Sequence, residues 1–129
     1  MRQAIYHGIL VNKAFIHENY PNKFKIFDSM ASGDWILYGI KIEKASIQKI
    51  IKDIQNELRS DLNFYAHLYN DKRLYIIFKR KVFKVKPHSS TWDAALDYGK
   101  TLGIPIEQLD FWPNRFQDEI HYFKDQNLE

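Results

Sequence analysis

The stretch NFYAHLYNDKRLYIIFKRKVFKV, residues 63–85, alternates between two kinds of side chain on either side of a polar break. A period of two is typical of β-strands that bury one face. A three-residue loop from Asn70 to Lys72 places Leu68 opposite Leu74 and brings six apolar side chains to one face: Phe64, Ala66, Leu68, Leu74, Ile76 and Phe78. A two-residue loop would instead set Tyr69 opposite Leu74. The stretch therefore predicts an antiparallel hairpin with a three-residue loop.

A second reversal is expected in the same stretch, because Phe83 and Val85 have the opposite phase from Ile76 and Phe78. A turn at residues 80 and 81 would place Phe78 opposite Phe83 and Ile76 opposite Val85, all on the core face. Arg-Lys lacks the glycine or asparagine that two-residue hairpin turns prefer. A bulge within one long strand is therefore the alternative.

The other face of these predicted strands carries the candidate binding surface. It combines aromatic, histidine and basic side chains, namely Tyr65, His67, Tyr69, Arg73, Tyr75 and Lys79, with Lys84 beyond them. Folding accounts for most of the apolar residues in the stretch. A function located here is therefore expected to use this second face.

Helices and further strands are predicted around the hairpins. Residues 44–60 carry Ile and Leu at helical spacing, and residues 90–103 begin with a Ser-x-x-Asp capping pattern and end at a glycine. Residues 20–31 are predicted as a third helix, although KFKIF within them also alternates, and Pro105 can open one more helical turn. Residues 35–42 are a predicted strand. Residues 5–11 are either a strand or the start of a helix.

This order of elements predicts an α+β fold, with a mostly antiparallel sheet and helices packed mainly on one face. A ferredoxin-like plait or a related two-layer sandwich is the nearest general scheme, and many unrelated functions use it. The 129 residues fit a single domain spanning 1–129. Residues 110–129 are expected to form a C-terminal extension that packs on it.

Composition excludes several classes of site. The chain contains no cysteine, so disulfides, thiolate metal sites and a cysteine nucleophile are ruled out. No segment has the length of apolar sequence that a membrane span or a signal peptide needs. We therefore expect a cytoplasmic protein with no membrane association, no cofactor and no metal.

Charge is distributed unevenly along the chain. Residues 1–86 contain 16 Lys or Arg and 8 Asp or Glu, whereas residues 87–129 contain 3 and 8, so the two parts differ in sign. Such a distribution indicates either a basic binding face with an acidic tail or two segments that neutralise each other after folding. Mutual neutralisation is the preferred interpretation for a single domain.

Three functions are compatible with the sequence. The preferred one is a non-catalytic binding or regulatory module whose partner is another copy of itself or another protein. The alternative is a single-stranded nucleic-acid-binding domain, which would use the face of Tyr65 and Tyr75 and the seven Lys or Arg of residues 72–86.

A small enzyme that uses His67 as a general acid or base is the second alternative. The C-terminal stretch from Asp110 to Phe123 adds Asp118 and His121 at a spacing of three, next to Glu119, together with Arg115 and Asp110, and these residues could line a site or bind a metal. Two ligands at this spacing are a weak indication of a metal site, because catalytic metals usually need three protein ligands.

Overall fold

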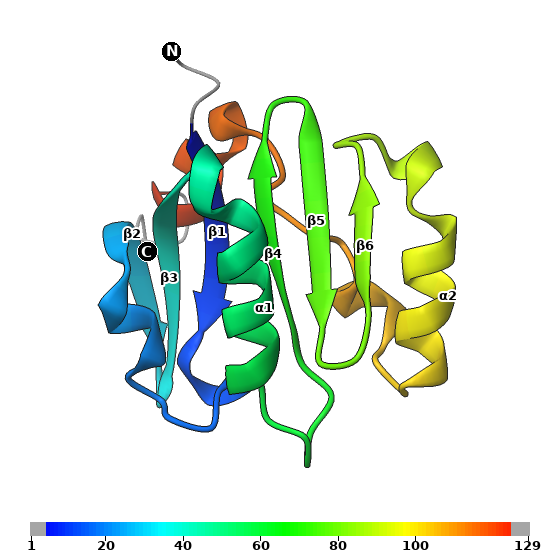
Figure 1. Cartoon of the computed structure of the whole chain (residues 1–129), viewed down its shortest axis with the longest axis horizontal. Helices are drawn as coiled ribbons and strands as arrows, with labels where there is room; N and C mark the ends of the chain where they lie inside the picture. The colour runs from blue at the N-terminus through cyan, green and yellow to red at the C-terminus, as the bar shows by residue number, and fades with distance from the viewer. Residues whose placement is uncertain (1–4, 125–129) are drawn as a thin grey trace.

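A computed structural model describes residues 5–124, and its central element is a six-stranded antiparallel sheet (Figure 1). The strands are β1 (Ile5–Val11), β2 (Lys25–Ser32), β3 (Trp35–Glu43), β4 (Tyr65–Asn70), β5 (Arg73–Phe78) and β6 (Val82–Val85). They lie in the order β2-β3-β1-β4-β5-β6, and each neighbouring pair is antiparallel. The α+β class is confirmed, and this strand order does not confirm a ferredoxin-like plait.

Two α-helices follow the predicted segments closely. Helix α1 (Ile47–Glu57) lies within 44–60, and α2 (Asp93–Thr101) lies within 90–103 and is followed by Gly103 at a φ of 84°. Short helical turns complete the structure at Asn12–Ala14, Tyr20–Lys23, Lys44–Ser46, Ser89–Thr91, Ile106–Gln108 and Phe116–Asp118, with a π-helical turn at Ile120–Lys124. None of the helices in the described part of the chain is both long and apolar enough to cross a membrane.

The predicted helix at residues 20–31 is wrong. Only Tyr20–Lys23 forms a short helical turn, and residues 25–32 form β2, which pairs with β3 at the edge of the sheet. Gly33 has a φ of 60° in the two-residue turn that joins Ser32 to Trp35. The alternation in KFKIF and this glycine favour a hairpin, and pairing with β3 supplies the backbone hydrogen bonds that a helix would otherwise make internally.

The predicted three-residue loop between β4 and β5 is also wrong. Asn70 pairs with Arg73, which leaves a two-residue turn of Asp71 and Lys72 and sets Tyr69 opposite Leu74. The Asn70 side-chain oxygen accepts hydrogen bonds from the backbone N–H groups of Lys72 and Arg73, each at 2.9 Å. This side chain fixes the shorter turn, and the one-residue shift moves every side chain of β4 to the face opposite the predicted one.

The second predicted reversal exists, but its register differs. Phe78 and Lys81 exchange backbone hydrogen bonds, so the turn residues are Lys79 and Arg80, and Ile76 pairs with Phe83 instead of Val85. The shift is an even number of residues. Phe83 and Val85 therefore remain on the same face as Ile76.

Both faces of the central strands β1, β4 and β5 are buried, contrary to the expectation that helices cover mainly one face. Helix α1 lies in front of the sheet in Figure 1 and packs its isoleucines against one core, which includes Ala66, Leu68 and Ile77. The second core lies on the far face and contains Tyr69, Leu74, Ile76, Phe78 and residues of α2. The chain after α2 passes behind the strands in Figure 1 and adds Phe111 and Phe123 to this second core.

Candidate ligand-binding site

The structure divides the predicted binding surface between the two faces of the sheet. Tyr65, His67 and Tyr69 lie on the far face, where the C-terminal segment covers them. Tyr75 is buried on the opposite face, in the core that α1 covers. The predicted set is therefore not one open surface, and the stacking platform that a nucleic-acid-binding sheet would need is covered.

The remaining members of the predicted surface have separate surroundings. Arg73 is exposed at the turn between β4 and β5. The Lys79 ammonium donates hydrogen bonds to the backbone oxygens of Gln55 at 2.8 Å and Asn56 at 3.1 Å. A cation stabilises the negative end of a helix, so Lys79 supports the last turn of α1.

The basic residues of the hairpins are spread along β5 and β6, with Lys84 opposite Tyr75 between the two ends of β5. Lys72 and Arg73 lie at one end of β5, and Lys79 to Lys81 lie at the other end. A six-residue strand separates these ends by roughly 20 Å. No ion pair among residues 5–124 joins a cation of residues 72–86 to an acid of the C-terminal part. Within residues 5–124, therefore, the expected neutralisation of the hairpins by the tail does not occur through ion pairs.

A cavity of about 370 Å³ lies between the far face of the sheet and the C-terminal segment. Strands β1 and β3 contribute Ile9, Val11, Trp35 and Leu37. The chain entering β4 and β4 itself contribute Asn63, Phe64, Tyr65 and His67. The chain after α2, residues 104–124, is called the C-terminal segment below. It contributes Ile104, Gln108, Asp110, Trp112 and Tyr122. An apolar cavity with a few polar groups is typical of a small-molecule site.

His67 supplies a polar group to the wall of this cavity and is only 4% exposed. Its Nε2 lies 2.7 Å from the carbonyl oxygen of Pro113, and because a carbonyl only accepts, Nε2 carries the proton. Burial lowers the pKa of His67 to about 4, so the ring is neutral at physiological pH. Nδ1 is thus an acceptor, and it has no hydrogen-bond partner among the described residues.

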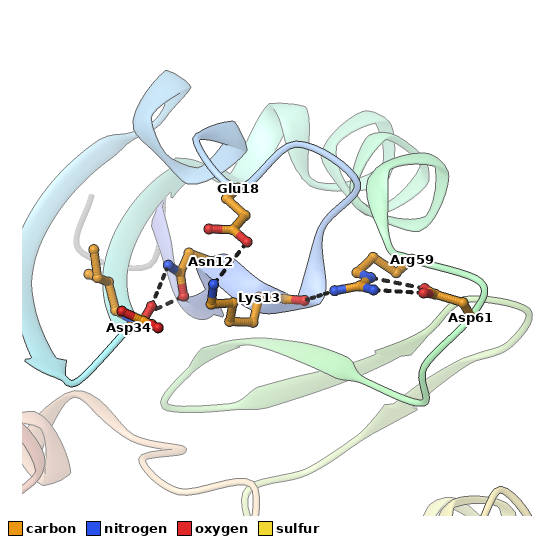
Figure 2. Close-up of polar contacts among 7 residues, drawn as sticks. Asn12, Lys13, Glu18, Asp34, Arg59 and Asp61 are labelled. Atoms are coloured by element: carbon orange, nitrogen blue, oxygen red, sulfur yellow. Dashed lines mark hydrogen bonds and ion pairs between the residues drawn. The ribbon is translucent and has the colours of Figure 1, made fainter.

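Asn12 positions one wall of the cavity. Its side-chain amide donates to the Asp34 carbonyl oxygen at 3.0 Å, and its oxygen accepts from the Ile36 N–H at 3.0 Å (Figure 2). These two bonds hold the backbone on both sides of Trp35. The Trp35 ring packs against Phe64, with ring centroids 5.7 Å apart, and stays 45% exposed.

The segment Asp110-Phe111-Trp112 forms the opposite wall. Phe111 is fully buried against Tyr65 and Trp92, and its φ is 48°, a left-handed conformation that is uncommon for a bulky residue. The Asp110 side chain accepts a hydrogen bond from the Trp112 N–H at 3.4 Å. The buried ring thus anchors a sharp bend that leaves Asp110 and Trp112 at the cavity, with Trp112 39% exposed.

A second polar cluster lies next to this site and joins β1 and β4 to the C-terminal segment. Glu119 Oε2 lies 2.6 Å from His7 Nδ1 and accepts a hydrogen bond from the Tyr69 hydroxyl at 2.5 Å. The His7 ring lies against Phe27 and Phe116, with ring centroids 4.4 and 4.5 Å away. These contacts attach the C-terminal segment to β1 and β4. They do not line the cavity.

The sequence analysis identified Tyr65 and His67 and also named Asp110 as a residue that could line a site, but it missed the two tryptophans that complete the cavity with them. Trp35 lies in the predicted strand at residues 35–42, and Trp112 lies in a segment with neither a helical nor an alternating pattern. The exposed positions of two of the three tryptophans are the signal that distinguishes them, and exposure depends on the tertiary structure.

Known proteins give no further indication of function. Comparisons with protein-family models, curated proteins and solved structures found no match to this chain. Within residues 5–124, no group of three or more His, Cys, Asp or Glu side chains is arranged to hold a metal ion. The chemistry of the cavity therefore carries the functional interpretation.

Proposed function

We propose that this protein is a non-catalytic binding module that holds a small organic ligand in the cavity between the sheet and the C-terminal segment. The observation that supports this proposal is an aromatic cavity of about 370 Å³ with the neutral imidazole of His67 in its wall. Apolar walls supply binding energy through burial, and the few polar groups that line the cavity, among them Asn63, Gln108 and Asp110, can orient a ligand.

A binding role fits His67 better than a catalytic one. General bases work best with a pKa near the operating pH, whereas burial holds the pKa of His67 near 4. The partner of Nε2 is the Pro113 carbonyl rather than a carboxylate, so among residues 5–124 no acidic group orients and charges the ring as in a catalytic triad. The second predicted alternative, a small enzyme that uses His67, therefore has less support.

The test is a binding screen with the whole chain and a cavity-filling variant. Leu37 lines the cavity and belongs to neither buried core, so Leu37→Trp fills the cavity at little cost to packing. Ile16→Trp is the matched control, because Ile16 is exposed and does not line the cavity. A panel of small aromatic and aliphatic amines, alcohols and acids would be followed by ligand-detected NMR.

We expect at least one class of compound to bind the native chain and the Ile16→Trp control, with binding lost in Leu37→Trp. Absence of binding across the panel at millimolar concentration would contradict the proposal. Equal binding to Leu37→Trp would also contradict it, because the ligand would then occupy another surface.

Self-association is a second candidate, favoured by the two exposed tryptophans at the cavity. Trp35 and Trp112 are 45% and 39% exposed, and large exposed aromatic side chains are enriched in protein interfaces. A second copy could cover both rings. Light scattering over a range of concentrations tests this, and a Trp35→Ser, Trp112→Ser variant should then shift the chain toward the monomer. A native chain that is monomeric throughout would exclude it.

A further inference from the structure

The charge at the cavity narrows the class of ligand. Asp110 is the one acidic side chain of residues 5–124 that lines the cavity, and no lysine or arginine of this part of the chain lines it. The protein as a whole has a net charge of +3. The cavity is therefore locally acidic although the protein as a whole is basic.

The aromatic rings around the cavity also favour a positively charged ligand. Trp35, Phe64, Tyr65, Trp112 and Tyr122 all contribute to its walls. The face of an aromatic ring carries partial negative charge, and it attracts ammonium groups within about 6 Å of its centre. Rings and carboxylate therefore act together on a cation, whereas they repel an anion.

The negative charge of Asp110 acts on two other side chains that line the cavity, Tyr65 and Tyr122. Burial is the main cause that raises the pKa of Tyr65 and of Tyr122, and the negative charge of Asp110 adds to the shift at both phenols. The pKa of Tyr122 rises to about 12. One carboxylate thus influences two hydroxyl groups that come from different elements, β4 and the C-terminal turn.

Three basic side chains, Arg59, Lys79 and the exposed Arg80, line a smaller hollow that shares Asn63 and Phe64 with the cavity. Two of them, Arg59 and Lys79, are engaged by other groups. Arg59 pairs with Asp61 at 2.6 Å and also contacts the Lys13 carbonyl oxygen (Figure 2). Lys79 binds the last carbonyls of α1. The positive charges of Arg59 and Lys79 are therefore partly compensated by Asp61 and by backbone carbonyl oxygens.

We propose that the cavity selects an organic ammonium ion with an apolar or aromatic body. The ammonium group lies at the mouth, between the Asp110 carboxylate and the exposed rings of Trp35 and Trp112. The body fills the space toward Ile9 and His67. This inference rests on the proposed function and adds the charge of the ligand to it.

The test compares three probes that share one skeleton and differ in charge: 2-phenylethylamine, 2-phenylethanol and phenylacetate. NMR titration of the native chain should give an affinity for the amine about tenfold higher than for the alcohol, since a desolvated cation on aromatic rings is worth 1 to 2 kcal/mol. Phenylacetate should bind most weakly. Raising the salt concentration should weaken only the binding of the amine.

Asp110→Asn isolates the contribution of the charge. Asparagine keeps an oxygen that can accept from the Trp112 N–H, so the bend is retained. We expect this variant to bind the amine about fivefold to tenfold more weakly and the alcohol unchanged. Asp97→Asn is the control, because Asp97 is exposed on α2 and does not line the cavity.

The outcomes separate the two proposals. If the alcohol or the acid binds at least as tightly as the amine, the selection of a cation is contradicted while the proposed ligand site stands. If the amine binds Asp110→Asn as tightly as the native chain, the role of Asp110 is contradicted. If no probe of the series or of the wider panel binds, the ligand site itself is contradicted.

Discussion

His67 is a buried polar residue of the sheet that lines the proposed ligand site. Its position on β4 places it under the C-terminal segment, its Nε2 is occupied by the Pro113 carbonyl, and its Nδ1 is left as an acceptor. A buried imidazole with one satisfied nitrogen remains neutral, because burial disfavours the charged form more than the carbonyl favours it. The burial that keeps this ring neutral therefore also makes the fold sensitive to acid.

We predict that acid destabilises the protein through His67. The pKa of His67 falls from 6.5 to about 4 on folding, so between these values the unfolded chain binds a proton that the folded chain does not. The free energy of unfolding is then unaffected by this group above pH 6.5 and decreases as the pH falls toward 4, by about 3 kcal/mol in total. Urea unfolding at pH 7.0 and pH 4.5 measures it.

His67→Gln is the matched variant, because glutamine can donate to the Pro113 carbonyl but does not titrate. The native chain should lose about 2 to 3 kcal/mol more stability than this variant between the two pH values. A variant whose stability declines in parallel with that of the native chain would show that His67 is not the group responsible.

At the scale of elements, the turn between β4 and β5 determines which side chains the cavity receives. With the predicted three-residue loop, Phe64, Ala66 and Leu68 would share a face with Leu74. The two-residue turn instead sends Tyr65, His67 and Tyr69 to the far face, together with Leu74 and Ile76. Asn70 makes this difference, because its side chain satisfies two backbone N–H groups within the shorter turn.

We expect Asn70→Ala to lower the free energy of unfolding by about 1 to 3 kcal/mol, since two backbone donors lose their acceptor in a turn that cannot relax without moving the strands. Lys72→Ala is the control at the same turn and should change stability by less than about 0.5 kcal/mol, because Lys72 is exposed. Urea unfolding of both variants measures this. Equal effects would indicate that Asn70 does not fix the register.

The alternation of residues 63–85 was enough to predict strands, but not their register. The apolar pattern favours the three-residue loop only if one face of the sheet is buried, and here both faces are. Because the second face is also buried, His67 and Tyr69 are core residues, and Tyr65 packs against the second core. The alternation of apolar and polar residues does not identify them as such. The same limit applies to residues 25–32, because a short alternating segment becomes a strand only when a partner such as β3 is beside it.

At the scale of the whole molecule, the C-terminal segment makes the site by closing the far face of the sheet. Residues 104–124 supply Phe111 and Phe123 to the core and Asp110 and Trp112 to the cavity. Glu119 fastens this segment to both β1 and β4, through His7 and Tyr69. The site therefore depends on contacts between residues more than 100 positions apart, as in the pair of His7 and Glu119.

Replacing Glu119 should loosen this attachment. In Glu119→Ala, His7 Nδ1 and the Tyr69 hydroxyl lose their common partner in a mostly buried environment, and we expect a loss of about 2 to 4 kcal/mol in the free energy of unfolding. Limited proteolysis should also cleave the C-terminal segment faster. Glu107→Ala is the control, since Glu107 is exposed in the same segment. Similar behaviour of the two variants would argue against this attachment.

The most direct measurement of the ligand site uses the three tryptophans as internal reporters. Trp35 and Trp112 line the cavity, whereas the Trp92 indole N–H is bonded to the Lys86 carbonyl at 2.7 Å, away from it. In a ¹⁵N-labelled chain titrated with 2-phenylethylamine, the indole signals of Trp35 and Trp112 should shift with one common dissociation constant while the Trp92 signal stays in place. Equal shifts of all three signals, or no shift at Trp35 and Trp112, would contradict a ligand site in this cavity.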